Sequence, residues 1–128
     1  ELRKRDNPTF VQNLVESRFR QLVTTFDEHT LETCSELQKA VKNASIIIGM
    51  HADGATEAIV DAAILYNKPF VVIPCCVFPK LFSQRTIQQT DGTIVQVRSH
   101  EQFCQYLLAK DARFEREVMP FEGRNVAI

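Results

Sequence analysis

Two apolar runs with a helical pattern between them organise the middle of the chain. Ser45–Met50 and Phe70–Ile73 are almost continuously apolar, which predicts parallel strands covered on both faces. Asn67-Lys68-Pro69 ends the intervening helix, because a residue before proline avoids the α region. Within that helix, one face carries Ile59, Ala62, Ala63 and Tyr66. The pattern therefore predicts two parallel strands joined by a helical crossover.

The preceding residues predict two helices and one short strand. Asn7-Pro8 suits an N-cap followed by the first helical position. Leu22–Phe26 is rich in β-branched and aromatic residues and indicates a strand. Thr33 and Glu36 fit a capping box, so a second helix is expected from there to about Asn43.

The following residues predict a hairpin and one more helix. The Asp91-Gly92 turn lies between Thr86–Thr90 and Thr93–Val97, which favours a small antiparallel excursion. Ser99 and Gln102 form another capping-box pattern that opens a helix with three large apolar residues facing inward: Phe103, Tyr106 and Leu107.

The last residues predict two antiparallel strands, over Phe114–Met119 and Asn125–Ile128. Together with the preceding elements, this order predicts a single α/β unit over residues 1–128. Its expected architecture is a three-layer, mostly parallel, doubly wound (Rossmann-like) sheet with a C-terminal antiparallel hairpin.

Composition removes several classes of function. The 128 residues carry a net charge of −1, so no overall field recruits nucleic acid or an anionic membrane. The longest apolar runs, Ser45–Met50 and Pro69–Val77, are too short to span a bilayer, and no membrane association is expected. The four cysteines show no disulfide-framework spacing. This favours a reducing, intracellular compartment, either cytoplasm or nucleus.

The first group of candidate site residues follows the strand 46–50. His51 and Asp53 are expected at the carboxyl end of this strand, with Thr56 and Glu57 close behind and Gly54 between them. Ligands of open parallel sheets bind outside such strand ends. An imidazole there can act as an acid or a base near neutral pH. The alternative is that Asp53 is only the N-cap of the next helix and His51 a turn residue.

The second group follows the strand 70–74. Cys75, Cys76 and Phe78 would face the same pocket, at the adjacent strand end. Because adjacent side chains on an extended chain point to opposite faces, at most one of the two thiols is expected to reach the pocket. The alternative is that both cysteines are small buried apolar side chains.

The sequence lacks two kinds of motif, and this limits which cofactors the chain is expected to bind. No C-x-x-C or H-x-x-x-H pattern occurs, and His51, Cys75 and Cys76 would supply at most three ligands, so no metal is expected. The four glycines form neither G-x-G-x-x-G nor a P-loop. A nucleotide-binding loop therefore either precedes Glu1 or is not part of this protein.

Two stretches resemble a known family. GMHADGATEAIVDAA and KPFVVIPCCVF are similar to the fourth and fifth strands, with their following turns, of class I S-adenosylmethionine-dependent methyltransferases. The nearest resemblance is to a eukaryotic branch that includes tRNA methyltransferases. FCQYLLAKDARFEREVMPFEGRNVAI is similar to the last helix and closing β-hairpin of that fold. The resemblance runs from about Leu22 to the end and is strongest over Ile46–Phe82.

The resemblance implies that the chain is the C-terminal half of a methyltransferase-like domain, without the N-terminal cofactor half. His51 and Asp53 would position or deprotonate the acceptor, which would be an RNA or a small molecule. S-adenosylmethionine is expected in the full-length protein and no cofactor in this chain alone. Members of this branch often carry Cys where Asp53 or its neighbour stands. They also often carry His soon after the Cys pair, where this chain has Val77-Phe78-Pro79.

Two other functions stay open at this point. One is a non-catalytic binding module that keeps the fold. The other is a thiol enzyme in which His51 activates Cys75 or Cys76. In either case, missing strands would leave a sheet edge or face exposed, so a homo-oligomer is expected.

Overall fold

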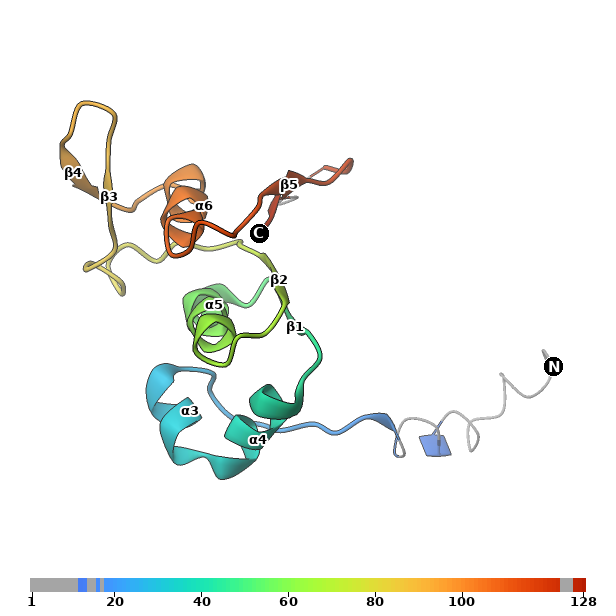
Figure 1. Ribbon diagram of the computed structural model, residues 1–128. Helices are drawn as coiled ribbons and strands as arrows, with labels where there is room; N and C mark the ends of the chain where they lie inside the picture. Colours follow the sequence, from blue (N-terminus) through green and yellow to red (C-terminus); the bar gives the residue numbers. More distant parts are fainter. Residues whose placement is uncertain (1–11, 14–15, 17, 123–125) are drawn as a thin grey trace.

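A pair of parallel strands joined by one helix forms the centre of the fold (Figure 1). The computed structural model describes residues 12–13, 16, 18–122 and 126–128. Strand β1 (Ile47–Met50) pairs with β2 (Phe70–Ile73) in parallel, and helix α5 (Thr56–Leu65) connects them. Both strands and the helix were predicted from the sequence and are confirmed.

Close packing between α5 and the two strands depends on Gly49. A Cβ atom added at Gly49 would lie 2.9 Å from Cδ1 of Ile59 and 3.1 Å from Cγ1 of Val72. The apolar face of α5 and both strands therefore approach each other closely, and Val60 and Val72 are completely buried there. Glycine at position 49 is therefore required for this close packing of α5 on the strands.

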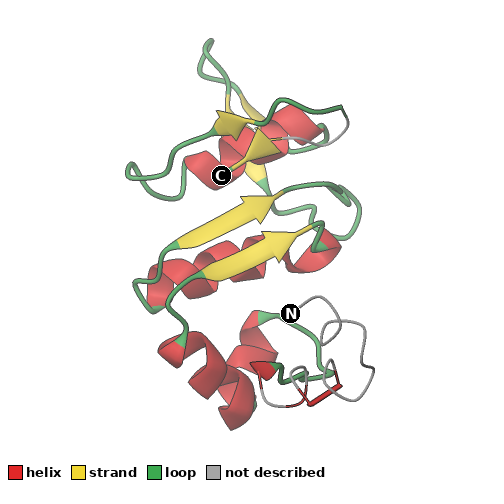
Figure 2. Cartoon of the chain, turned by 90° about the vertical axis from the view of Figure 1, so that its right-hand side faces the viewer, coloured by secondary structure: helices red, strands yellow, loops and turns green. Residues whose placement is uncertain are grey.

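The opposite face of β1 and β2 is uncovered in the described part of the chain. Figure 2 shows α5 crossing behind the two strands, while no described helix covers their front face. Ile48 and Met50 are 61% and 64% exposed, and Val71 on β2 is also exposed. The sequence predicted strands covered on both faces, and here only the α5 face is covered.

The C-terminal residues attach to the free edge of β2. Strands β5 (Glu117–Val118) and β6 (Val126–Ala127) form the predicted antiparallel hairpin. Ile128 then exchanges two backbone hydrogen bonds with Val72, at 2.9 and 3.0 Å. This reciprocal pattern is that of an antiparallel pair, so the end of the chain extends the sheet beside β2.

The segment between β2 and β5 follows the prediction closely. Strands β3 (Thr86–Gln88) and β4 (Ile94–Gln96) form the antiparallel hairpin, and α6 (His100–Leu108) follows. The Ser99–Gln102 capping box is present in both directions. Phe103 and Leu107 of α6 are completely buried, which joins this helix to the core of β2 and α5.

The N-terminal predictions need correction. Leu22–Phe26 forms no strand, since Leu22 and Phe26 pack against the helices instead of pairing with a neighbour. Helix α3 (Glu28–Thr33), capped by Asp27, was not predicted, and α4 (Ser35–Asn43) follows it with Cys34 as its N-cap residue. Thr33 is the last residue of α3, so its predicted capping box is wrong. Most of the predicted helix from Asn7-Pro8 lies outside the described residues.

The described residues thus form a mixed α/β fold built from one parallel pair and two antiparallel hairpins. Within these residues the sheets have two strands each, with Ile128 bonded to the edge of the parallel pair. None of the described helices has the length and apolar character that crossing a bilayer requires.

Candidate functional site at the ends of β1 and β2

The turns that follow β1 and β2 meet at one edge of the parallel pair. The backbone N–H of His51 donates to the carbonyl of Ile73 at 3.3 Å, which continues the strand pairing into the turns. Beyond it, Sγ of Cys75 donates to Oδ1 of Asp53 at 3.2 Å, although 22 residues separate them in the chain. The predicted meeting of these two turns at one strand end is confirmed.

Both thiols, and not one, converge on Asp53. The carboxylate oxygen of Asp53 and the sulfurs of Cys75 and Cys76 all lie within 4.8 Å of one another. The sequence predicted that at most one thiol would reach the pocket, because adjacent side chains were expected to point to opposite faces, whereas both sulfurs lie near the same carboxylate. The premise of that prediction was an extended backbone, whereas β2 ends at Ile73 and the cysteines lie in the irregular segment that follows.

Unusual backbone conformations surround this cluster. Four described non-glycine residues have positive φ, and three of them lie in the cluster or within two residues of it: His51 at 50°, Asp53 at 47° and Phe78 at 49°. His and Asp tolerate this region better than most residues, but an aromatic residue there is strained. Such strain gathers at active sites and ligand-binding turns. Gly54, in the same turn, is not among the described glycines with positive φ.

Hydrogen bonding shifts the pKa values of the cluster in opposite directions. The thiols of Cys76 and Cys75, with a smaller contribution from the nearby imidazole of His51, hold the pKa of Asp53 below its ordinary value. The carboxylate of Asp53, together with Cys75, raises the pKa of Cys76 to about 11. At neutral pH the carboxylate of Asp53 is therefore ionised and the thiol of Cys76 is protonated.

Asp53 is not the N-cap of α5. A short 3₁₀ turn, Asp53–Ala55, precedes this helix, and its N-cap residue Ala55 makes no side-chain bond. The carboxylate of Asp53 is thus left to the two thiols. Thr56 was predicted to line the pocket, but it is completely buried and its hydroxyl donates to the carbonyl of Asp53 at 3.0 Å. Thr56 therefore stabilises this turn from its buried side and does not line a pocket.

Glu57 points away from the cluster into a separate ionic network. Its carboxylate accepts hydrogen bonds from Nε of Arg85 at 2.6 Å and from the hydroxyl of Tyr106 at 2.5 Å, and it pairs with Lys110 at 2.8 Å. Arg85 is 2% exposed, and its guanidinium stacks on Phe82 with 3.6 Å between Cζ and the ring centroid. Arg85 and Lys110 were not predicted from the sequence, and Tyr106 was predicted only as an inward-facing residue of its helix.

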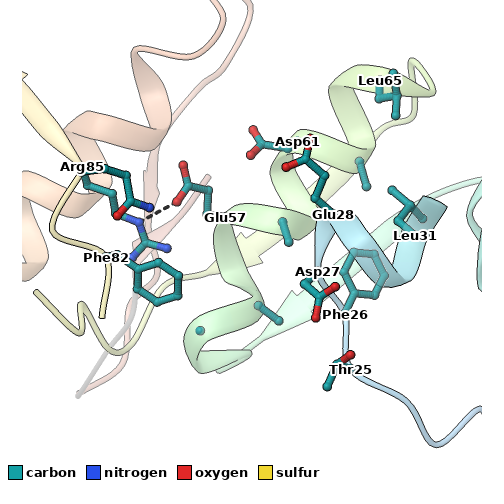
Figure 3. Close-up of a pocket in the computed structure, with 15 residues that line it drawn as sticks. Thr25, Phe26, Asp27, Glu28, Leu31, Glu57, Asp61, Leu65, Phe82 and Arg85 are labelled. Carbon is teal, nitrogen blue, oxygen red and sulfur yellow. Dashed lines mark hydrogen bonds and ion pairs between the residues drawn. The ribbon is translucent and has the colours of Figure 1, made fainter. Parts of the chain in front are cut away.

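A hollow of about 840 Å³ lies between α3, α5 and the segment that carries Phe82 and Arg85 (Figure 3). Apolar side chains such as Leu31 and Leu65 line it together with three acidic residues, Asp27, Glu28 and Asp61. Figure 3 shows Glu57 and Arg85 on one side of it, joined to each other. Of the predicted site residues only Glu57 lines this hollow, so it is distinct from the Asp53 cluster.

Phe78 lines a different hollow, which none of the three cluster residues lines. Its side chain is 40% exposed. Lys80 and Arg98 line the same hollow of about 700 Å³. Gln96 and Pro79 also line this hollow, and the amide of Gln96 donates to the carbonyl of Pro79 at 2.8 Å. An exposed aromatic ring thus stands next to two basic side chains.

The chemistry available at this edge comes from four kinds of group: an ionised carboxylate, two thiols, an exposed imidazole and an aromatic ring with basic neighbours. Comparison with protein-family models, with curated proteins and with solved structures found no match for this chain.

Proposed function

We propose that this chain is the acceptor-binding side of a methyltransferase-like domain. The observation that carries the proposal is the meeting of Asp53 and Cys75 at the carboxyl ends of two parallel strands. Ligands of open parallel sheets bind just outside such ends. The two stretches that form these turns resemble methyltransferases, and this resemblance is the basis for the proposed reaction class.

In this proposal His51 and Asp53 handle the acceptor. Methyl transfer is a displacement that depends on alignment of the two reactants and, for an N–H or O–H acceptor, on removal of one proton. The low pKa of Asp53 keeps a carboxylate ready to orient the acceptor, and the exposed imidazole of His51 takes the proton. S-adenosylmethionine, held by the full-length protein, would supply the methyl group.

The proposal includes a larger, three-layer doubly wound sheet to which β1 and β2 belong. Parallel sheets occur with both faces covered, yet Ile48 and Met50 are exposed on the face opposite α5. The antiparallel attachment of Ile128 at the edge of β2 is common in doubly wound sheets. Further strands beside β1 and helices over its open face would complete such a domain and carry the glycine-rich cofactor loop.

An RNA acceptor fits the surface beside the site. Proteins that recognise single-stranded RNA stack bases on aromatic side chains and hold phosphates with basic ones. The exposed ring of Phe78, next to Lys80 and Arg98, offers this combination within one hollow. The proposed acceptor is therefore an RNA base, and a small molecule is the alternative outcome of the test.

Calorimetric titration with S-adenosylmethionine tests the reaction class. Residues 1–128 alone are expected not to bind, whereas a chain extended upstream with its native sequence is expected to bind at micromolar concentration. In the extended chain, His51→Ala and Asp53→Ala should lower methyl transfer and leave cofactor affinity unchanged. Micromolar binding to residues 1–128 alone would refute the proposal that this chain lacks the cofactor-binding half of the domain. An extended chain without affinity would favour the non-catalytic module.

Fluorescence anisotropy with a labelled single-stranded RNA tests the acceptor. Phe78→Ala should weaken binding about tenfold, because stacking of one base contributes about 1–3 kcal/mol. Phe121→Ala is the matched control, since Phe121 is also exposed but lies in the turn between β5 and β6. Equal losses in both variants, or no binding by the wild type, would reject RNA as the acceptor.

We also propose that residues 1–128 alone self-associate through β1. The outer edge of β1 pairs with no described strand, and Ile48 and Met50 stand exposed beside it. Exposed strand edges with apolar neighbours pair readily with a second chain. Sedimentation velocity at micromolar concentration should show a dimer that Ile48→Lys converts to a monomer. A monomeric wild type would contradict this proposal.

A further inference from the structure

Three potential metal ligands converge at the ends of β1 and β2. One carboxylate oxygen of Asp53 and the sulfurs of Cys75 and Cys76 lie within 4.8 Å of one another. No other set of three His, Cys, Asp or Glu side chains converges in this way within residues 18–122 and the other described positions. The donor set is two sulfurs and one oxygen, which differs from the all-oxygen sites of Ca²⁺ and Mg²⁺.

We propose that Asp53, Cys75 and Cys76 bind one zinc ion through two thiolates and one carboxylate, with the two thiol protons released to solvent as the Zn–S bonds form. Thiolate ligands select Zn²⁺ and other soft metals over Mg²⁺, Ca²⁺ and Mn²⁺. Cys sulfur and Asp oxygen are both established zinc ligands. No metal was expected from the sequence, because His51 and the two cysteines would supply at most three ligands and no C-x-x-C pattern occurs, whereas the structure brings Asp53 into the set.

The distances suit a tetrahedral ion. With Zn–S near 2.3 Å and Zn–O near 2.1 Å, tetrahedral geometry places the two sulfurs about 3.8 Å apart and each sulfur about 3.6 Å from the oxygen. The Cys75 sulfur is 3.2 Å from Oδ1 of Asp53, and all three atoms fall within 4.8 Å. Adjustments of about 1 Å at most, through side-chain rotation, would therefore form the site.

The backbone holds both ligand-bearing turns in place without the ion. The His51 N–H donates to Ile73 and the Ala55 N–H donates to the carbonyl of Ala52 at 2.9 Å. On the other turn, Nε2 of His100 lies 2.9 Å from the carbonyl oxygen of Pro74. Ligand sites on rigidly supported backbone are preorganised for binding. The positive φ values at His51 and Asp53 are consistent with this, since such strain gathers at ligand-binding turns.

Three protein ligands leave one coordination position open. Structural zinc sites are closed by four protein ligands, whereas catalytic sites keep one position for water or substrate. Asp53 and Cys76 are exposed, so solvent reaches the open position. In the proposed methyltransferase, zinc would make Asp53 a ligand, leaving His51 as the base. The zinc proposal itself depends only on the three ligands and goes beyond the proposed function.

Titration of residues 1–128 with Co²⁺, followed by absorption spectroscopy under reducing conditions, tests the site. One Co²⁺ per chain should produce a thiolate-to-metal charge-transfer band and tetrahedral d–d bands, and one equivalent of Zn²⁺ should remove both. Cys75→Ser, Cys76→Ser and Asp53→Ala should each weaken Co²⁺ binding at least about a hundredfold. The reason is that losing even an outer-shell partner of a metal site costs 10–100-fold. Cys34→Ser, at the junction of α3 and α4, is the matched control and should change nothing.

A second measurement needs no variant and so does not depend on variant folding. Zn²⁺ should protect Cys75 and Cys76 of the wild type from iodoacetamide while Cys34 stays reactive, as located by tandem mass spectrometry. The absence of a charge-transfer band, equal protection of Cys34, or Co²⁺ binding that survives both Cys75→Ser and Cys76→Ser would overturn the proposal. None of these outcomes bears on S-adenosylmethionine binding, so the two proposals fail separately.

Discussion

Nε of Arg85 donates a hydrogen bond to Oε2 of Glu57 over 2.6 Å, joining residues 28 positions apart. Arg85 is 2% exposed at its side chain and Glu57 15%, so this ion pair is largely withdrawn from water. A second nitrogen of Arg85, Nη1, donates to the carbonyl of Val77 at 3.1 Å. The pair thus ties α5 to the segment that leaves the candidate site.

Glu57→Gln should destabilise the fold by about 3 kcal/mol. Removing one partner of a buried ion pair leaves the other charge uncompensated, which costs about 3–5 kcal/mol. Urea denaturation followed by circular dichroism measures the change. Glu101→Gln is the matched control, because Glu101 pairs with Arg116 at the surface and exposed pairs contribute less than about 1 kcal/mol. Equal losses in the two variants would contradict the prediction.

The same carboxyl should make stability depend on pH in the acid range. Burial alone would raise the pKa of Glu57, but hydrogen bonds from Lys110, Tyr106 and Arg85 hold it below its ordinary value. The unfolded chain therefore takes up the proton at a higher pH than the folded chain. The stability that Glu57 contributes is complete above the ordinary Glu pKa and is lost as the pH falls through the lower folded-state pKa. Urea midpoints should show the difference between wild type and Glu57→Gln shrinking in that range.

Much of the fold could be predicted because its signals are local. The apolar runs of β1 and β2, the helix between them and the Ser99–Gln102 capping box each depend on residues close in sequence. The approach of Asp53 to Cys75 followed from one further rule, that parallel strands end at the same edge. This part of the site was therefore accessible without a structure.

The rest depended on contacts that no local pattern records. The sequence offers two helix caps in this region, Thr33 and Asp27. Asp27 is the one that caps a helix, because its carboxylate accepts the N–H of Thr30 at 2.7 Å. Leu22–Phe26 has strand propensity, but a strand also needs a partner, and none lies beside it in the described chain. In the sequence, Arg85 has no neighbours that distinguish it from a surface charge. Its contacts with Phe82 and Glu57 are formed only in the folded structure.

Gly49→Ala should destabilise the fold by about 2 kcal/mol. Its Cβ would lie 2.9 Å from Ile59 and 3.1 Å from Val72, and overpacking of this kind typically costs about 1–3 kcal/mol. Gly54→Ala is the control, since its Cβ would meet Phe82 at an ordinary 3.5 Å, and a change within about 0.5 kcal/mol is expected. Urea midpoints measure both variants. A Gly49→Ala protein as stable as wild type would mean that α5 lies farther from β1 than described.

Cys76 should alkylate slowly near pH 8, and Asp53→Asn should accelerate it about tenfold. The carboxylate of Asp53 is the main cause that raises the pKa of Cys76 to about 11, against an ordinary value of 9.0. Restoring the ordinary pKa would increase the thiolate fraction about a hundredfold, but the less basic thiolate is about tenfold less nucleophilic. Iodoacetamide labelling of the metal-free protein, resolved by tandem mass spectrometry, gives the rate at each cysteine.

Cys34 provides the internal control for this measurement, because it lies at the junction of α3 and α4 and should react at the same rate in both proteins. An unchanged rate at Cys76 would mean that the carboxylate does not control this thiol. Fast, stoichiometric labelling of Cys75 or Cys76 in the wild type at neutral pH would favour the thiol enzyme instead. The carboxylate contact argues against Cys76 as that nucleophile, because a nucleophilic cysteine needs a lowered pKa and Asp53 raises the pKa of Cys76.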